Sequence, residues 1–280
     1  PLAMPTYIVA YCYADLLDYS GPLQSALRAV LGVHSRRDYW FPEIRSLGGL
    51  VLVLSFVLYP YVYLSARATF LQQSVGTLEV ARTLGHTLTQ TFFAVALPLA
   101  RPALAAGAAL AMLESMNDIG AAEHLGVRTL TVTAYATWIQ RSSLAGAAQI
   151  ASIMLMFVVL LFWLEHATRG AASFANAAGR FRQVPETELV GGKGYIALGV
   201  CLLPFLLGFA VPVAVLAGSA LSHLGEALDS GFWRAAGTSI AVALVVAAST
   251  LALGVVLAYA QRVAPNGFRP PAVRVAGTGY

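Results

Sequence analysis

The sequence predicts an all-α fold, a polytopic bundle of transmembrane helices with about six spans in this chain. Apolar residues make up 58% of the 280 residues and charged residues only 11%, whereas an ordinary soluble domain carries about 25% charged residues. Several apolar stretches also approach the roughly 20 residues that a helix needs to cross the hydrocarbon core. Because backbone groups in lipid must find partners within their own segment, these stretches are expected to be helices.

Six apolar stretches qualify, or nearly qualify, as spans. The first looks truncated at its start. The third contains a segment rich in alanine and glycine at 103–111, which predicts close packing against a neighbouring helix. In chain order the expected spans are residues 1–17, 47–66, 97–116, 144–164, 195–220 and 235–260.

Composition and motifs argue against several other classes of protein. The formal charge of +4 is modest and the basic residues are scattered, so a nucleic-acid surface is not expected. The two cysteines lie in separate apolar runs, which makes a disulfide framework implausible. The five histidines show no zinc-ligand spacing, and the Gly-x4-Gly-Lys-Ser/Thr phosphate-binding motif is absent from the sequence.

The connection at 77–98 has the pattern of a short helix, a turn and a re-entry into the membrane. Thr77 is expected to cap the helix, and Glu79 in its first turn would complement the helix dipole. Gly85 is expected to end this helix, and Pro98 suits the first turn of the next one. A further set, spaced to form one apolar edge for docking in a groove, consists of Leu78, Ala81 and Leu84.

The same connection resembles the cytoplasmic "EAA" coupling loop of binding-protein-dependent ABC importer permeases. That pattern is Glu-Ala-Ala, three residues, Gly, nine residues, then an aliphatic residue, any residue, Leu and Pro. The spacing is intact here, and the one departure is a valine in place of the first alanine. The matching positions are Glu79, Val80, Ala81, Gly85, Val95, Leu97 and Pro98.

Resemblance beyond the loop covers nearly the whole chain and indicates the ferric-iron subgroup of these permeases, in which two helix bundles are fused. On this basis residues 1–167 are expected to form the later part of the first bundle, including the coupling loop at 74–97. Residues 168–194 would be a cytoplasmic linker, and residues 195–280 the beginning of the second bundle. A second coupling loop is expected in such proteins, but none precedes Tyr280, so the sequence looks like part of a fused permease.

The resemblance also implies partners and a location. The chain would lie in the bacterial inner membrane as a multi-pass permease, without enzymatic activity or a bound cofactor of its own. ATP and Mg²⁺ would bind to a separate cytoplasmic ATPase subunit, and the coupling helix would sit in a groove of that subunit. A periplasmic binding protein would deliver substrate, and the bundle would alternate between outward and inward access.

Four acidic residues at the outer ends of the first and third spans are candidates for the substrate path. Carboxylates at membrane depth are costly and usually face an interior or a water-filled cavity, and a hard cation such as ferric iron prefers oxygen ligands. Alternatively, these carboxylates cap helix ends or pair with Arg128 and Arg141. His124, in the outer loop, is a further candidate for a substrate contact, and its alternative interpretation is a solvated surface residue. The four candidates are Asp15, Asp18, Glu114 and Asp118.

Two other classes remain to be compared with the importer interpretation. A secondary transporter driven by an ion gradient can also carry repeats and membrane-depth carboxylates, but a coupling loop has no purpose without an ATPase. An intramembrane enzyme would need a nucleophile–base or metal set within the spans, and the sequence offers none. Among importers, permeases for thiamine, sulfate, molybdate and polyamines share the coupling loop and are alternatives to iron.

Overall fold

The computed structural model describes residues 2, 4–73, 75–169, 189, 191–222 and 230–263. All the regular elements in this part of the chain are helices, which confirms the all-α prediction. The chain forms two compact units, Pro1–Ala217 and Gly218–Tyr280. The predicted linker at 168–194 falls almost wholly outside the described residues and stays a prediction, as does the division into bundles that depends on it.

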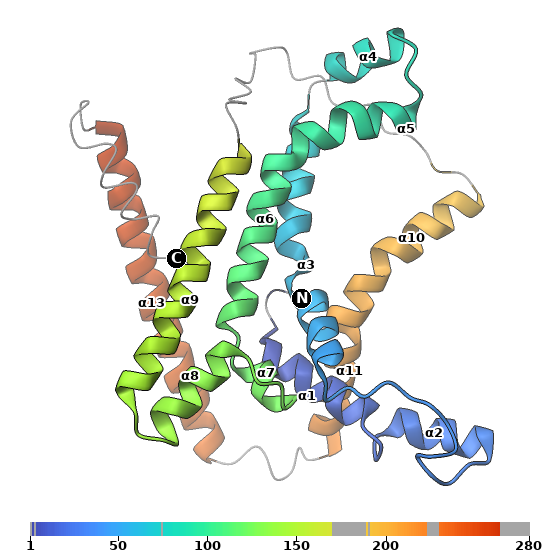
Figure 1. Ribbon diagram of the computed structural model, residues 1–280, viewed down its shortest axis with the longest axis vertical. Helices are drawn as coiled ribbons and strands as arrows, with labels where there is room; N and C mark the ends of the chain where they lie inside the picture. Colours follow the sequence, from blue (N-terminus) through green and yellow to red (C-terminus); the bar gives the residue numbers. More distant parts are fainter. Residues whose placement is uncertain are drawn as a thin grey trace. The chain divides into compact units, whose positions relative to one another are not determined.

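The helices alternate between long membrane-sized segments and short connecting ones (Figure 1). Two of the long segments contain a π-helical turn, η1 at Phe92–Ala96 and η2 at Leu206–Ala210. The α-helices are α1 (Thr6–Leu17), α2 (Pro22–Leu31), α3 (Leu47–Gln72), α4 (Val75–Thr83), α5 (Leu88–Thr91), α6 (Leu97–Asn117), α7 (Gly120–His124), α8 (Leu130–Ile139), α9 (Leu144–Arg169), α10 (Gly192–Phe205), α11 (Val211–Ser222) and α13 (Ser230–Val263).

Five described helical segments are long and apolar enough to cross a membrane, and they correspond to five of the six expected spans. The remaining expected span, at 1–17, is occupied by α1, which has only 12 residues. At 1.5 Å per residue α1 rises about 18 Å, which is short of the ~30 Å hydrocarbon core. The five segments are Leu47–Gln72, Leu88–Asn117, Leu144–Leu164, Gly192–Ser222 and Gly231–Val256.

The buried core of the first unit lies at the end where α1 and α7 pack against the beginning of α3 (Figure 1). Ser46 starts α3 there, because its side chain accepts a hydrogen bond from the Gly49 N–H at 3.2 Å. This end of the unit therefore contains the cluster of buried apolar residues. The buried core residues are Val9, Ala10, Tyr13, Ala14, Ile44, Leu50, Val53, Leu54, Val57, Leu58, Ala121, Ala122 and Leu125.

Helices α3 and α6 approach each other closely at Gly107, as the run of small residues predicts. A Cβ atom at Gly107 would lie 2.8 Å from the Tyr61 carbonyl oxygen and 2.8 Å from the Val62 Cα. Both distances are shorter than real Cβ contacts, so only glycine fits this crossing without backbone movement.

Each π-helical turn precedes a proline. The Leu97 N–H bonds to the Phe92 carbonyl and the Val211 N–H bonds to the Leu206 carbonyl, five residues back instead of four. Pro98 is the second residue of α6, as predicted. The reason differs from the one expected, because α5, η1 and α6 run on as one helical segment, and the widened turn is what accommodates the missing N–H.

The second π-helical turn is held to α1 by a tyrosine. The Val211 N–H bonds to the Leu206 carbonyl, so the Leu207 carbonyl would have to accept from residue 212. That residue is proline, which has no N–H to donate. The buried Tyr13 hydroxyl donates to the Leu207 oxygen at 2.6 Å. A carbonyl that the helix leaves unpaired is thus satisfied by a side chain from a distant segment.

Tyr13→Phe is therefore expected to lower stability by about 1–3 kcal/mol, because it leaves a partly buried carbonyl without its donor. The measurement is thermal unfolding in detergent. Tyr19→Phe is the matched control, because its hydroxyl bonds to the His34 carbonyl at an exposed site. Equal melting temperatures for wild type and Tyr13→Phe would contradict this account of the turn.

Candidate functional site

The connection between α3 and α6 lies at the opposite end of the first unit from α1, α2 and α7 (Figure 1). It consists of α4 and α5, which are joined by a short turn. Gln73, at the end of α3, donates from its side-chain nitrogen to the Ala96 carbonyl in η1 at 2.8 Å. The two ends of the connection are thus tied together where the chain enters and leaves the long helices.

Gly85 ends α4 in the way the sequence predicts. Its φ of 93° lies in the left-handed region, where a side chain is strained and glycine is not. The Gly85 N–H bonds to the Arg82 carbonyl at 3.0 Å, and the His86 N–H bonds to the Ala81 carbonyl at 3.2 Å. This pair of bonds is the Schellman motif. A Cβ at position 85 would meet no atom within 4 Å, so glycine is required by the backbone angle and not by space.

A capping box that the sequence analysis missed begins the next helix. The Gln90 N–H bonds to the Thr87 hydroxyl at 3.3 Å, and the Thr87 N–H bonds to the Gln90 side-chain oxygen at 2.9 Å. The signal was present as Thr-x-x-Gln immediately before an apolar run. With Gly85 on one side and Thr87 on the other, the turn between α4 and α5 has a defined geometry.

Two expectations about the start of α4 were wrong. The helix begins at Val75, so Thr77 lies inside it and is not its cap. Glu79 consequently lies in the second turn instead of the first, where the effect of the helix dipole has weakened. Val75 and Gly76 add two helical positions before Thr77.

The apolar edge of α4 also differs from the predicted one. Ala81 is 6% exposed, whereas Leu84 is 76% exposed and Val80 is 59% exposed. Val80 and Leu84 are four residues apart and therefore lie on one face. The outward surface of α4 is thus formed by Val80 and Leu84 with the exposed Glu79 beside them, while Ala81 packs inward.

At the opposite end of the unit, Asp118 acts as a helix cap. Its carboxylate accepts hydrogen bonds from the Ala121 N–H at 2.9 Å and from the Thr6 hydroxyl. The backbone of Asp118 is extended, so its side chain turns to the start of α7. Glu114 stays within α6, where its carboxylate lies 3.4 Å from the Tyr61 hydroxyl. Glu114 and Asp118 are four residues apart, which would place them on one face of a continuous helix, but α6 ends between them and they do not share a face.

Asp18 pairs with Arg45, and not with Arg128 or Arg141, the partners considered in the alternative interpretation. The Arg45 Nε donates to the Asp18 carboxylate at 3.1 Å, and a second guanidinium nitrogen donates to the His124 carbonyl at 2.9 Å. The backbone N–H of Tyr19 also bonds to this carboxylate at 3.0 Å. Arg45 therefore links the end of α1 to the end of α7.

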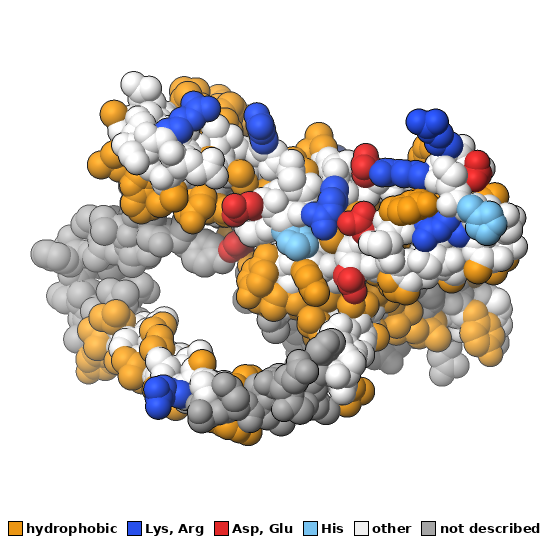
Figure 2. Space-filling model, turned by 90° about the horizontal axis from the view of Figure 1, so that it is seen from below, with side chains coloured by type: hydrophobic (Ala, Val, Ile, Leu, Met, Phe, Trp, Pro, Cys, Tyr) orange, Lys and Arg blue, Asp and Glu red, His pale blue; other side chains and the backbone are white. Residues whose placement is uncertain are grey.

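These groups line a polar cavity of about 270 Å³ that brings Asp15 and Asp18 together with Arg45 and His124. The His124 Nε2 is buried and has no hydrogen-bond partner among the described residues. Charged side chains gather on this end of the first unit (Figure 2). In the described part of the chain, no three His, Cys, Asp or Glu side chains gather closely enough to hold a metal ion. The cavity is therefore lined by charged groups, and its described residues do not include a three-ligand metal site.

The Asp18–Arg45 pair predicts a small acid sensitivity. The hydrogen bond from Arg45 lowers the pKa of Asp18, so the pair stabilises the folded state above the ordinary carboxyl pKa of about 3.9. That contribution is lost as the pH falls through the lowered pKa. Both side chains are nearly half exposed, so its size is expected to stay within about 1 kcal/mol.

The measurement is the melting temperature of wild type and Asp18→Asn between neutral and acidic pH. The variant should be less stable at neutral pH and should lose less stability on acidification. Asp38→Asn is the matched control, because Asp38 bonds to the Ser35 N–H in an exposed turn. Identical pH profiles for wild type and Asp18→Asn would contradict the role of the pair.

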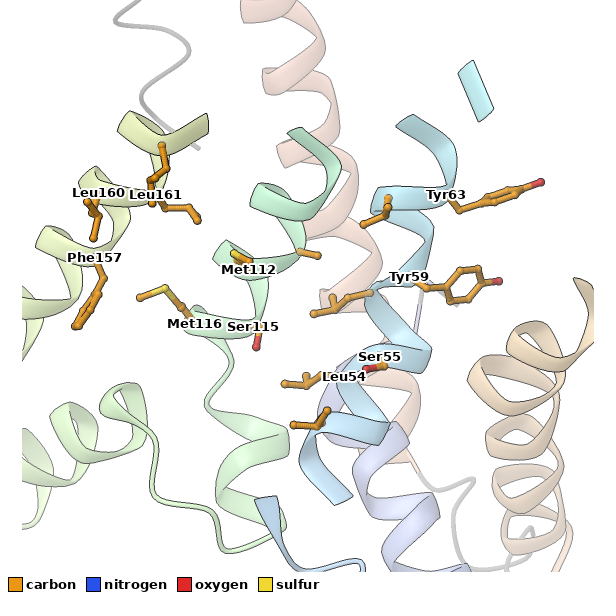
Figure 3. Close-up of a pocket in the computed structure, with 15 residues that line it drawn as sticks. Leu54, Ser55, Tyr59, Tyr63, Met112, Ser115, Met116, Phe157, Leu160 and Leu161 are labelled. Atoms are coloured by element: carbon orange, nitrogen blue, oxygen red, sulfur yellow. The ribbon is translucent and has the colours of Figure 1, made fainter. Parts of the chain in front are cut away.

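A larger cavity of about 840 Å³ lies among α3, α6 and α9, and its lining is almost entirely apolar. Phe157, Leu160 and Leu161 line it from α9, and Met112 and Met116 from α6 (Figure 3). The rings of Tyr59 and Tyr63 point away from α9 (Figure 3). No charged side chain lines this cavity, so it suits an apolar occupant and not a hydrated ion.

The chain matches the protein family described as "binding-protein-dependent transport system inner membrane component" over residues 3–169. This region contains the α4–α5 connection and the polar cavity. No solved structure matches the chain.

Several curated proteins are similar to the chain. A ferric transport system permease protein of Actinobacillus pleuropneumoniae is 22% identical over 92% of this chain and 40% of its own length. A molybdate/tungstate transport system permease protein of Pyrococcus abyssi is 38% identical over 26% of this chain and 29% of its own length. A protein provisionally named a 2-aminoethylphosphonate transport system permease, from Salmonella paratyphi A, is 28% identical over 58% of this chain and 56% of its own length. In each case the chain spans less than two thirds of the relative.

Proposed function

The chain belongs to the family of binding-protein-dependent transport system inner membrane components, and we propose that it forms part of the permease of an ATP-driven importer. In this proposal α4 docks in a groove of a separate ATPase subunit, which binds ATP and Mg²⁺. A substrate-binding protein delivers substrate at the opposite end of the bundle. The helices of this chain form the substrate path and change conformation, and the chain itself does not hydrolyse ATP.

The observation that carries this proposal is the construction of the α4–α5 connection. A Schellman motif, a capping box and the Gln73 bond fix its geometry, while Val80 and Leu84 stay exposed on one face. A helix-in-groove contact needs such an apolar pair on a rigid helix. Because the connection continues directly into α6, a displacement of α4 would move a spanning helix, as a rigid-body switch requires.

In this proposal the α4–α5 connection and the polar cavity lie on opposite sides of a membrane. Helix α3 has 26 residues and rises about 39 Å, which exceeds the ~30 Å hydrocarbon core. The α4–α5 connection follows the end of α3, whereas the buried core formed with α1 and α7 surrounds the beginning of α3. With α4 in the cytoplasm, the cavity containing Asp15 and Asp18 would open on the outer side.

We further propose ferric iron as the substrate. Similarity to the ferric permease over 92% of the chain supports it, as does the presence of Asp15 and Asp18 in one outer cavity. Glu114, within the third span, would extend an oxygen-lined path inward, since hard cations favour oxygen ligands. Asp118 would act indirectly, by holding the α7 segment that carries His124.

Uptake into membrane vesicles tests the class and the substrate together. The full-length permease is expressed with the ATPase and the binding protein of the same importer. Uptake of ferric iron and of molybdate is then compared with and without ATP. Iron uptake that requires ATP is the expected result. ATP-dependent uptake of molybdate alone would keep the importer and overturn the substrate, and iron uptake without ATP would favour a gradient-driven carrier.

The substrate path is tested by Asp15→Asn, with Asp38→Asn as the control, because Asp15 lines the cavity and Asp38 does not. Asp15→Asn is expected to reduce ferric uptake several-fold while ATPase association is unchanged. If both variants transport iron at the wild-type rate, the outer cavity is not part of the path.

A further inference from the structure

Helix α2 presents its polar side to the protein, which is the reverse of a surface helix in water. The buried Gln24 side chain donates to the Leu17 carbonyl at 2.7 Å and accepts from the Tyr39 hydroxyl at 2.6 Å. One turn later, Arg28 donates to the Tyr19 carbonyl at 2.8 Å and to the Tyr39 hydroxyl at 3.2 Å. Its guanidinium also lies 4.1 Å from the centre of the Tyr19 ring.

The apolar side of α2 faces away from these contacts. Val30 is 84% exposed, and Leu23, Ala26 and Leu31 are exposed as well. Positions 23, 26 and 30 are separated by three and four residues, so they form one stripe along the helix. Since Gln24 and Arg28 occupy the other side, the stripe of α2 that faces outward is apolar, and the exposed Ser25 lies beside Arg28.

The position of α2 indicates what covers this face. The helix has 10 residues, too few to span a bilayer, and it projects sideways beyond the end of α3 (Figure 1). Close by in the chain, Leu47 and Val51 at the start of α3 are exposed on a spanning helix, where lipid is the expected neighbour. The apolar face of α2 and the apolar start of α3 are both exposed at this end of the unit, so lipid suits the face of α2 as well.

The loop after α2 has the composition of a membrane–water boundary. Trp40 is 86% exposed, and the exposed Arg36 and Arg37 precede it. Tryptophan beside basic residues is typical of the headgroup region. Charged side chains gather on the face of the unit seen in Figure 2, and this end of the spans is therefore the one expected to face water.

We propose that α2 is an interfacial helix, which lies in the membrane surface at the end of the spans opposite α4 with its apolar face in lipid. Such helices bind through a buried apolar face with polar groups held at the headgroup level. Through Gln24 and Arg28 the lipid contact would hold the end of α1, and with it the Asp18–Arg45 pair. This inference requires only that the spans cross a membrane, and it does not depend on the ATP-driven function.

The test is a measurement of collision rates at nitroxide spin labels on the full chain in liposomes of phosphatidylcholine and phosphatidylglycerol. Cys12 and Cys201 are replaced by serine, and a label is attached through Val30→Cys or, in a separate protein, through Arg37→Cys. Oxygen is concentrated in lipid, and a water-soluble nickel chelate stays outside it. Both native positions are exposed, so neither label removes a packing contact.

The oxygen-to-nickel collision ratio is expected to be several-fold higher at position 30 than at position 37. Leu23→Cys, on the same stripe, should give the same result as Val30→Cys and serves if one variant is poorly made. Equal ratios at positions 30 and 37 would place the face in water and overturn the proposal. Low collision rates with both reagents at positions 23 and 30 would show that a protein covers the stripe, which would also overturn it.

Discussion

Gly85→Val is expected to abolish ATP-driven uptake while the permease still inserts into the membrane. Gly85 holds a φ of 93°, and a β-branched residue in that region carries strain on the order of 1–3 kcal/mol. Such a penalty shifts a two-state equilibrium by roughly 5- to 150-fold, away from the conformation in which α4 is correctly terminated. The measurements are uptake into vesicles and co-purification of the ATPase subunit.

Gly85→Asn is the matched control, because asparagine tolerates a positive φ better than other side chains. It should retain more uptake than Gly85→Val although both side chains enter open space. If valine and asparagine are equally active, the backbone angle at Gly85 has no role in coupling. If both are equally inactive, the side chain itself blocks docking and the explanation from backbone strain is wrong.

Gly107→Ala is expected to lower the stability of the protein by forcing α3 and α6 apart. The added Cβ would lie 2.8 Å from backbone atoms of Tyr61 and Val62, and backbone cannot move aside as a flexible side chain can. Overpacking of this kind costs about 1–3 kcal/mol, because α3 and α6 must separate. The measurement is the melting temperature of the detergent-solubilised protein.

Gly199→Ala is its control, since Gly199 also lies within a long apolar helix and a Cβ there would meet no atom within 4 Å. Alanine at this position is expected to be neutral or slightly stabilising, because glycine is the poorer helix former. If the two variants melt at the same temperature, the close crossing at Gly107 does not hold the bundle together.

The spans and the end of α4 could be predicted because local chemistry determines them. Hydrophobic length fixes where a helix can cross a membrane, and five of the six expected spans are present as helices. Gly85 was correctly expected to stop α4 because a positive φ depends on that residue and its immediate neighbours. The close approach at Gly107 likewise followed from a run of small residues.

The errors arose where distant segments decide the outcome. The partner of Asp18 is Arg45, which α1 meets only because α3 packs beside it. Asp118 and Glu114 have the spacing of one helix face, but α6 ends just before Asp118, which caps α7 instead. The inward placement of Ala81 depends on the packing of α4 against α5 and η1, which periodicity within α4 alone cannot reveal.

The inverted orientation of α2 belongs to the same class. Its sequence is clearly amphipathic, but which side meets the protein is set by Tyr19 and Tyr39, in the segments before and after it. A sequence pattern shows that a helix has two faces. Only the folded structure shows which of the two faces does not pack against the rest of the protein.

The most direct test of the central claim is site-specific cross-linking between α4 and the ATPase subunit in the full-length complex. Cysteine is placed at Leu84 or, as a control at the opposite end of the bundle, at Trp40, in a permease whose native cysteines are replaced by serine. A cross-linked permease–ATPase product from position 84 and none from position 40 is the predicted result. No product from position 84, or equal products from both positions, would contradict the assignment of α4 as the element that couples the membrane helices to ATP hydrolysis.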